Sequence, residues 1–158
     1  MPIALLLPAF QLLHPMPGVI TQGVRPGHPA IDIACAPGTV VRAAHDGVAH
    51  VERSYTHGIT VVIHGSDGLE TSYSHLQRAE ASGAIPRGAV IGRCGNTGIW
   101  SSGPHLHFES NRPELLGNLL RDEDAGQALP TAQRTDPADI GAVPASGGSP
   151  SSIQAPRY

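Results

Sequence analysis

Alternation between apolar and polar residues is the dominant pattern over the first 112 positions of the chain. Short alternating runs are separated by turn-forming Gly, Pro, Asn and Asp residues. Since successive side chains of an extended strand point to opposite faces, this pattern predicts strands with one buried face. The expected strands are residues 19–24, 30–34, 40–43, 48–53, 60–64, 70–75, 89–91 and 105–109.

Two Asp-Gly pairs stand between such runs, in "HDGVAH" and "GSDGLE". Asp-Gly is a strong signal for the tight turn of a β-hairpin, because the central residues of that turn adopt positive φ. The composition, with 4% aromatic residues, 19 Gly and 15 Pro, is turn-rich and disfavours a helical bundle. We therefore predict a mostly β fold built on an antiparallel sheet or half-barrel.

The pattern changes after Arg112. The segment "PELLGNLLRDED" predicts a short helix over residues 113–124, with its leucines on one face. Residues 125–158 are rich in Ala, Pro, Gly and Ser and have no periodicity, which is typical of a flexible or disordered tail. A chain of 158 residues fits one domain. We place that domain at residues 17–112, after a lead-in segment of residues 1–16.

The N-terminus has an apolar run from Ile3 to Leu7 that no basic residue precedes and that Pro8 interrupts. A secretory signal has a basic start, and a membrane helix needs about 20 apolar residues, so we expect neither here. The net charge of -3 gives no basic surface for nucleic acid or for an anionic membrane.

Nine His against two Cys is an informative imbalance. Imidazole is a common metal ligand and the acid or base that works near neutral pH. Cys35 and Cys94 lack CxxC spacing; they form one disulfide or pack as two small buried apolar residues. We favour the second interpretation, because a single pair is not a disulfide framework.

Two motifs place polar side chains in strand-like segments. In "GPHLHFES", His105 and His107 share one face of a strand, with Cβ atoms ~7 Å apart, while Leu and Phe occupy the other face. In "LETSYSHLQ", the same alternation puts Tyr73 and His75 on one face. Taken singly, each motif also fits an ordinary half-exposed strand.

A third motif lies upstream in "RPGHPAIDIACAPGT", where His28 and Asp32 have the spacing HxxxD. Their Cα atoms would stand ~13 Å apart in a fully extended chain, so a bend near Pro29 is needed to bring both to one metal ion. Alone, such a pair is more often two solvated polar residues in a loop.

The order of these motifs resembles the lysostaphin-type, or LytM-domain, zinc endopeptidases of bacterial cell walls. The resemblance runs from about Gly18 to Glu109 through "HPAIDIA", "APGTVVRAAHDGVAHV", "GITVVIHGSDGLETSYSHL", "RGAVIGRCGNTG" and "SSGPHLHFE". It implies a duplicated β architecture and an enzyme that hydrolyses peptide cross-links of peptidoglycan. Two histidines and one carboxylate as protein ligands, with the fourth position left for water, suit a hydrolytic zinc ion.

By this resemblance, His28, Asp32 and His107 bind one zinc ion, while His75 and His105 lie near the water that the metal activates. One neutral imidazole accepts the proton of that water, and the other donates to the oxyanion or to the leaving amine. We assign His105 as the base and His75 as the oxyanion partner. No HExxH motif supplies a glutamate base instead.

Three further positions follow from the resemblance. Tyr73, and Asn96 in the "CGNTG" loop, either line the substrate groove or serve as packing and turn residues. Ala30 stands where the family usually has Gly within HxxxD, and a methyl group there calls for at most a local adjustment unless the position needs positive φ. All five metal and catalytic positions are filled, unlike in inactive members of the family.

Two other functions remain as alternatives. A catalytically inactive module would keep the fold and bind the wall or regulate a partner. A phosphocarrier of sugar transport would share the β architecture and use paired histidines, but that chemistry needs neither the Asp ligand nor HxH. Because peptidoglycan lies outside the cytoplasmic membrane and we expect no signal peptide, a phage lysin, a virion-associated enzyme, leaderless export or a misassigned start codon would each explain the location.

Overall fold

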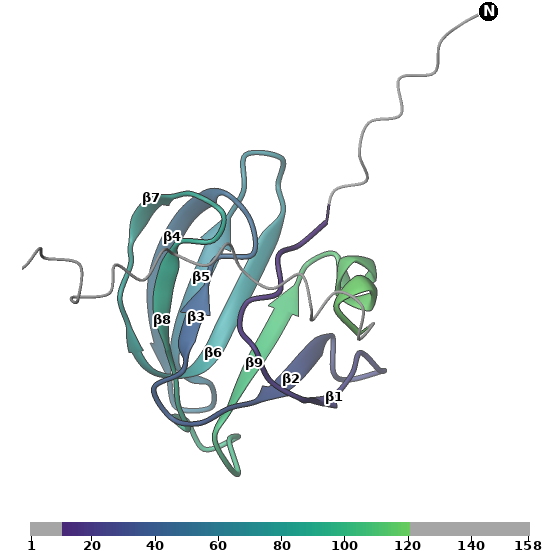
Figure 1. Ribbon diagram of the computed structural model, residues 1–158, viewed down its shortest axis with the longest axis vertical. Coiled ribbons are helices and arrows are strands. Elements are labelled where there is room, and N and C mark those ends of the chain that lie inside the picture. Colours follow the sequence, from purple (N-terminus) through teal and green to yellow (C-terminus); the bar gives the residue numbers. More distant parts are fainter. Residues whose placement is uncertain (1–10, 121–158) are drawn as a thin grey trace, which may run out of the picture.

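The computed structural model describes residues 11–120 and shows one antiparallel sheet that curls around a single core (Figure 1). The main strand order is β1-β2-β9-β6-β5-β4-β7, and β8 pairs with both β3 and β6. The elements are β1 (Ile20–Gln22), β2 (Ala30–Ala34), β3 (Val40–Arg42), β4 (Gly47–Ser54), β5 (Gly58–His64), β6 (Glu70–Ala79), β7 (Gly83–Ile85), β8 (Val90–Cys94), β9 (His105–Ser110) and the 3-10 helix η1 (Pro113–Leu120).

The mostly β, antiparallel prediction is confirmed. The "GSDGLE" turn joins β5 to β6 as a hairpin, as expected. The "HDGVAH" prediction is wrong, because β3 pairs with β8 while β4 pairs with β5 and β7. Asp46 of that segment instead accepts a hydrogen bond from the backbone N–H of Arg87 (2.6 Å), so it links distant turns. The short edge strand β7 was not expected.

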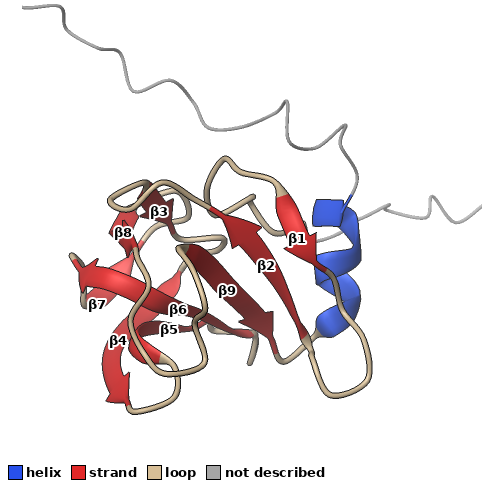
Figure 2. Cartoon of the chain, turned by 90° about the horizontal axis from the view of Figure 1, so that it is seen from below, coloured by secondary structure: helices blue, strands red, loops and turns tan. Residues whose placement is uncertain are grey.

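The helix is observed as a 3-10 helix over Pro113–Leu120. The rest of the predicted helix, the predicted tail and residues 1–10 of the predicted lead-in lie outside the described residues. The helix lies beside β1 and β2 and packs on the β2 and β9 side of the sheet (Figure 2), where Leu116 and Leu119 are buried. No helix within residues 11–120 has the length and apolar character needed to cross a membrane.

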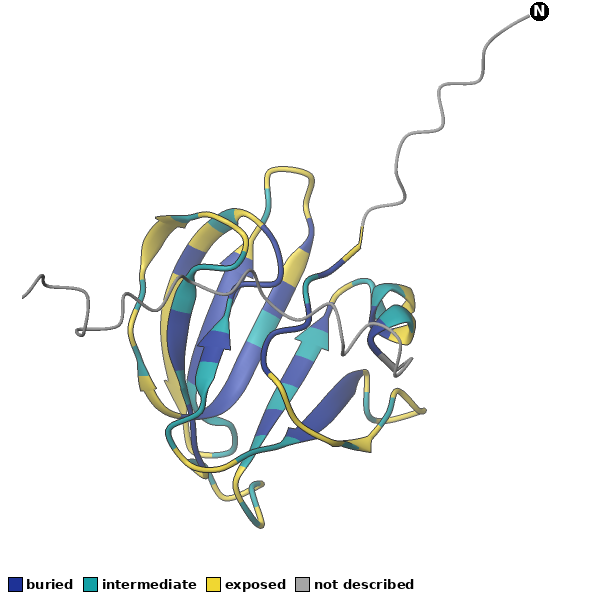
Figure 3. Cartoon of the chain, in the orientation of Figure 1, coloured by how far each residue is buried: buried dark blue, intermediate teal, exposed yellow. Residues whose placement is uncertain are grey.

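The core lies on the inner side of the curled sheet (Figure 3); buried positions alternate along β9, while β5 and β6 each have a run of four buried residues. Tyr73 of β6 and Phe108 of β9 are fully buried, with ring centroids 4.9 Å apart. Leu12 and Met16 of the lead-in segment are buried against the same cluster. Burial of each such large side chain stabilises the fold by about 1.5–3 kcal/mol. The outer face of the central strands is left for polar side chains.

A disulfide joins Cys35 to Cys94, so the expectation that these cysteines are unpaired is wrong. Cys35 directly follows β2 and Cys94 ends β8, two strands that do not pair with each other. The curl of the sheet brings their ends together, with Cα atoms 6.6 Å apart. That distance lies within the range a disulfide can span, and only the three-dimensional path of the chain reveals it.

Candidate active site

Pairing between β2 and β9 forms the centre of the site. Asp32 lies directly opposite His107 in the antiparallel register, although the two residues are 75 positions apart. The Nδ1 atom of His107 is 2.7 Å from Oδ1 of Asp32, whose residue is only 4% exposed. Alternation along β9 sends His105 to the same face and Leu106 and Phe108 to the core, as the sequence predicts.

His28 reaches this pair from a bend before β2. The backbone groups of Arg25 and His28 hydrogen bond to each other in both directions, and Gly27 within this turn has φ 79. The bend thus lies just before Pro29, and it puts Nε2 of His28 3.3 Å from Oδ2 of Asp32. The other ring nitrogen, Nδ1, donates to the carbonyl oxygen of Gly23 at 3.1 Å, because a carbonyl can only accept.

The donor set fits a zinc ion. Ligand atoms from His28, Asp32 and His107 all lie within 4.8 Å of one another. Two imidazoles and one carboxylate are the ligands of many hydrolytic zinc sites, and a histidine ligand usually donates its other N–H to a carbonyl or carboxylate. His28 does so to Gly23, and Nε2 of His107 lies 3.7 Å from Oε1 of Glu109.

The metal-free electrostatics of this centre are strongly coupled. Burial disfavours a charged ring at His107, but the carboxylates of Asp32 and Glu109 outweigh it and raise the pKa of His107 to about 9. Burial likewise disfavours the Asp32 carboxylate, but the hydrogen bond and charge of His107 prevail and lower the pKa of Asp32. Without metal, the Asp32 carboxylate is therefore negatively charged and the ring of His107 is positively charged, so the two form an ion pair.

His75 enters the site through an irregularity in β6. Between Tyr73 and Leu76, β6 has one residue more than the facing stretch of β5, and His75 is in the left-handed region with φ 63. Among the described residues no other non-Gly residue has positive φ. The backbone N–H of His75 donates to the carbonyl of His57 (2.9 Å), which holds this conformation in place.

This bulge breaks the alternation expected for the segment, so Tyr73 and His75 do not share a face. Tyr73 is fully buried in the core, and its hydroxyl accepts from the backbone N–H of Ala44 at 2.8 Å. Of the two interpretations left open for Tyr73, the structure supports packing. Asn96 is exposed and interacts with Ser101 in its own loop. Neither residue lines the pocket described next.

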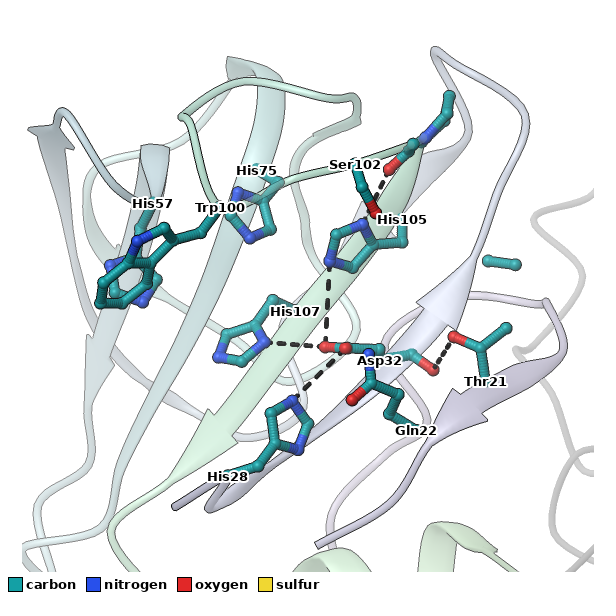
Figure 4. A pocket seen from close by; sticks show the side chains of 13 residues that line it. Thr21, Gln22, His28, Asp32, His57, His75, Trp100, Ser102, His105 and His107 are labelled. Carbon is teal, nitrogen blue, oxygen red and sulfur yellow. Dashed lines mark hydrogen bonds and ion pairs between the residues drawn. The ribbon is translucent and has the colours of Figure 1, made fainter.

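A cavity of about 360 Å³ opens over the cluster of His28, Asp32 and His107 (Figure 4). His75 and His105 both line it, with ring centroids 4.7 Å apart. The Nδ1 atom of His75 donates to Thr97 O (2.7 Å), and that of His105 donates to Gly103 O (2.8 Å). Because Nδ1 carries the proton in both rings, each neutral ring turns the lone pair of Nε2 towards the cavity.

The family model for Peptidase family M23 matches residues 26–118, which span β2 to β9 and most of the helix. The chain belongs to this peptidase family. One curated relative is the DD-carboxypeptidase/endopeptidase Mpg of Neisseria meningitidis, which is 45% identical over 110 residues. That alignment covers 68% of this chain but only 24% of the relative, so the chain spans about a quarter of the length of Mpg.

Solved structures of other bacterial and prophage-encoded proteins have a similar fold. The catalytic domain of the prophage-encoded M23 protein EnpA from Enterococcus faecalis, crystallised as a mutant, is 33% identical with a TM-score of 0.57. The match covers 66% of this chain and 90% of that domain. A zinc-containing peptidase from Vibrio cholerae is 28% identical, also with a TM-score of 0.57, over 63% of this chain and 36% of that protein.

Ala30 is accommodated in β2 without backbone strain. It lies in β2 opposite Glu109, is fully buried, and has no positive φ. The extended backbone of β2 therefore accepts a methyl group where the family usually has Gly.

His57 and Trp100 are among the cavity-lining residues that were not predicted. The ring of His57 stacks on that of His75 at 6.0 Å, and the edge of Trp100 packs on His57 at 4.9 Å. Both residues lie in loops, and neither belongs to a motif that signals function in sequence. Their proximity depends on contact between the β4–β5 turn and the β8–β9 loop, where Trp100 N–H donates to Thr56 O at 3.2 Å.

Proposed function

We propose that this chain is a zinc-dependent endopeptidase that hydrolyses peptide cross-links of bacterial peptidoglycan. The observation that carries the proposal is the convergence of His28, Asp32 and His107 below an open cavity that two further histidines line. Because the chain belongs to the M23 peptidase family, hydrolysis of a peptide bond is the reaction to expect from this arrangement. The zinc content named for the Vibrio cholerae peptidase and the activities named for Mpg point the same way.

His28, Asp32 and His107 would hold the zinc ion. When bound, zinc supplies a Lewis acid that polarises the scissile carbonyl and makes water a nucleophile near neutral pH. The hydrogen bond from His28 to Gly23 keeps Nε2 of that ring unprotonated and ready to coordinate. Asp32, buried between its partners, contributes the negative charge of the ligand set.

His105 is the proposed general base. Its Nδ1–H is committed to Gly103, so Nε2 is the free acceptor within the cavity. Nε2 also lies 3.9 Å from Oδ1 of Asp32. When His105 takes a proton from the attacking water, this carboxylate stabilises the imidazolium that forms.

His75 is the proposed partner of the oxyanion and of the leaving amine. Burial lowers the pKa of His75, although its bond to Thr97 opposes this, and nearby histidines add to the lowering. Because such a ring is neutral near pH 7, the proton that it passes to the leaving amine is the one that His105 takes from the attacking water, so no proton is gained or lost in the cycle. Protonated on Nε2, it also donates a hydrogen bond to the developing oxyanion, while Nδ1–H keeps its orientation.

The proposed substrate lies across the outer face of the sheet. A second hollow of about 310 Å³ continues from His57 over hydroxyl and carboxylate groups of β4, β5, β6 and β9. Thr60, Ser72 and Ser74 line it with hydroxyl groups that suit the amides of an extended peptide. The two hollows meet at His57, so a peptide can pass from one through the catalytic centre to the other.

The proposed place of action is the bacterial cell wall, outside the cytoplasm. The Cys35–Cys94 disulfide supports this location, because disulfides persist in oxidising compartments and are rare in the cytosol. A phage lysin, a virion-associated enzyme and an exported bacterial enzyme all act there. We propose no nucleic-acid partner.

Digestion of purified peptidoglycan tests the function, with mass spectrometry of the released fragments. The zinc-loaded protein is expected to release fragments with new amino termini, and a chelator is expected to stop this. Asp32→Asn and His107→Ala should abolish release, while His50→Ala, at an exposed site on β4, should not. Products with new sugar ends, or no hydrolysis by the correctly folded zinc-loaded protein, would refute the proposal; the second result would indicate an inactive module.

A further inference from the structure

We propose that the Cys35–Cys94 disulfide positions the ring of His105, and that reduction of this bond releases the ring while the fold persists. The disulfide lies at the base of the β8–β9 loop, residues 95–104. Cys94 precedes the loop, and the backbone N–H of Cys35 donates to the carbonyl oxygen of Pro104 at its end (3.3 Å). The consequence for catalysis, though not the positioning itself, rests on the proposed function.

The β8–β9 loop supplies the hydrogen-bond partners of the His105 ring. Nδ1 of His105 donates to the carbonyl oxygen of Gly103 (2.8 Å) and lies 3.2 Å from Oγ of Ser101. The backbone of His105 is held separately, because it belongs to β9 and its N–H donates to Gly95 O (3.2 Å). The path of the loop therefore determines how the ring points into the cavity (Figure 4).

The first half of the loop is held independently of the disulfide. Thr97 Oγ1 accepts from the backbone N–H of Ile59 and donates to the carbonyl oxygen of Leu76. The backbone N–H of Trp100 donates to the β4–β5 turn at 3.2 Å. The Thr97 carbonyl that orients His75 belongs to this half. We therefore expect His75 to keep its orientation when the disulfide is broken.

The second half of the loop depends on Cys35. Within residues 11–120, the backbone of residues 102–104 makes one hydrogen bond to another backbone group, the one from Cys35 N–H to Pro104 O. At 3.3 Å it is longer than the usual ~2.9–3.0 Å, so it restrains the loop only if Cys35 is itself fixed. The disulfide fixes Cys35 to Cys94, which is fully buried and held by two backbone hydrogen bonds of 2.8 Å.

Reduction removes this restraint from the side of Cys35. Cys35 is partly exposed and Cys94 is fully buried, so a reductant approaches the sulfur of Cys35. A trialkylphosphine attacks that sulfur, the S–S bond breaks, and the sulfur of Cys94 leaves and takes up a proton. Water then hydrolyses the P–S bond, which gives the phosphine oxide and the Cys35 thiol, so each cysteine gains one electron and one proton. A phosphine adds no thiolate, the ligand type that would compete for zinc.

NMR of protein with ¹⁵N-labelled histidine tests the positioning without reference to activity. In metal-free protein at constant pH, reduction should change the ring-nitrogen signals of His105 from those of one tautomer to an average of two, and leave those of His75 unchanged. Cys35→Ala/Cys94→Ala should show the changed His105 signals with or without phosphine. The matched control Leu69→Ala destabilises the core directly before β6 and keeps the disulfide, so its His105 signals should equal those of the wild type.

Hydrolysis tests the catalytic consequence. In the zinc-loaded protein, reduction should lower kcat at least about tenfold and change KM less, because small displacements of a catalytic group are costly. Zinc content measured in the same sample should stay constant, and reoxidation should restore kcat. Leu69→Ala should retain the wild-type kcat in the absence of denaturant.

Three results would overturn the proposal: His105 signals that reduction leaves unchanged, an equal change in the signals of His75, or the same change in Leu69→Ala. Changed His105 signals with an unchanged kcat would support the positioning and refute the role of His105 as base. If the oxidised, zinc-loaded protein hydrolyses nothing, the proposed function fails, and the ring signals still decide whether the disulfide positions His105.

Discussion

Hydrogen bonds to the protein backbone determine which nitrogen each pocket histidine presents. His28, His75 and His105 each donate Nδ1–H to a carbonyl, so Nε2 is the reactive atom in all three rings. His107 is the exception, since Nδ1 faces Asp32 and Nε2 faces Glu109. Neighbouring histidines therefore present different ring nitrogens, and the hydrogen-bond acceptor beside each ring determines which nitrogen it is.

The affinity of the metal-free protein for zinc should depend on pH through His107. Burial opposes its charge, but Asp32 and Glu109 raise the pKa of His107 to about 9, so the ring carries a proton at pH 7.5. Zinc must displace that proton, and affinity should therefore rise about tenfold per pH unit from pH 7.5 to about 9. Competition with a chromophoric chelator measures it.

The variant Glu109→Gln provides the control for this pH dependence. It removes one of the two carboxylates that hold the proton on His107, so the rise in affinity should level off at a lower pH. His50→Ala should match the wild-type protein at every pH. An affinity that does not change above pH 7.5 would contradict the role given to His107.

Sequence reasoning succeeded where a functional residue sits on a regular strand and failed where the backbone departs from one. Alternation placed His105 and His107 on one face, and the pairing of β2 with β9 brought Asp32 to them. The same rule failed for Tyr73, because an extra residue in β6 reverses the direction of the side chains after it. Nothing in single-residue preference marks a bulge at that position.

At the scale of elements, one side of the cavity depends on two loops held against each other. The β8–β9 loop donates from Ile99 N–H to Tyr55 O (3.0 Å) in the β4–β5 turn. Thr97 Oγ1 accepts from Ile59 N–H at 3.0 Å and donates to Leu76 O at 2.7 Å. The contacts between the two loops join segments about 40 residues apart, which is why His57 and Trp100 were absent from the predicted site.

Trp100→Ala should weaken substrate binding more than it slows the chemical step. Trp100 lines the cavity yet is 65% exposed, so little of the core depends on it. Loss of an aromatic contact of about 1–1.5 kcal/mol should raise KM about tenfold, with kcat changed by less. Tyr55→Ala is the matched control, because Tyr55 is exposed on the adjoining turn but does not line the cavity. Equal effects of the two changes on KM would contradict this role.

Gly98→Ala should damage the site through the packing of the loops. Gly98 has φ +84, and a Cβ atom there would overlap backbone atoms of Gly58 and Thr56. The loop must move, and with it the carbonyl of Thr97 that orients His75. We expect kcat to fall at least about tenfold, because small displacements of catalytic groups are costly. In steady-state assays, Gly117→Ala, in η1 away from the cavity and with open space around it, should retain activity.

At the scale of the whole molecule, the disulfide and the core connect different parts of the fold. The core holds the curled sheet together, while the Cys35–Cys94 bond ties the end of β2 to the end of β8 across 59 positions of sequence. The pairing was beyond sequence reasoning because it depends on where two non-adjacent strands end. All the strands except β7 were predictable, since each of the others leaves a local pattern.

Removal of the disulfide should lower stability substantially. A bond that closes a loop of this length restricts the unfolded chain and is worth about 2–4 kcal/mol. Cys35→Ala/Cys94→Ala should therefore reduce the free energy of unfolding by about that amount in urea titrations. Reducing agent should destabilise the wild-type protein to the same level and leave the variant unchanged. No difference between reduced and oxidised wild-type protein would exclude a stabilising role.

Acid should destabilise the fold through buried His45. Burial lowers the pKa of His45, although the carbonyl of Asp46 opposes this, and Nε2 lies 2.9 Å from Thr71 Oγ1. As pH falls below the ordinary value of about 6.5, the unfolded chain takes up a proton that the folded protein resists. Stability should fall with pH by up to about 1.4 kcal/mol per unit for this group. Urea titrations from pH 7 to 5 should show a shallower fall for His45→Gln but not for His50→Gln.

The position of β9 determines when the site can exist during synthesis of the chain. In the main strand order, β9 alone joins β1 and β2 to β6 and the strands beyond it, and it also supplies His105 and His107. A growing chain can form the β5–β6 hairpin early, but the two portions of the sheet stay unconnected until residue 110 has left the ribosome. Translation itself thus delays completion of the proposed site, because the last described strand completes both the sheet and the proposed ligand set.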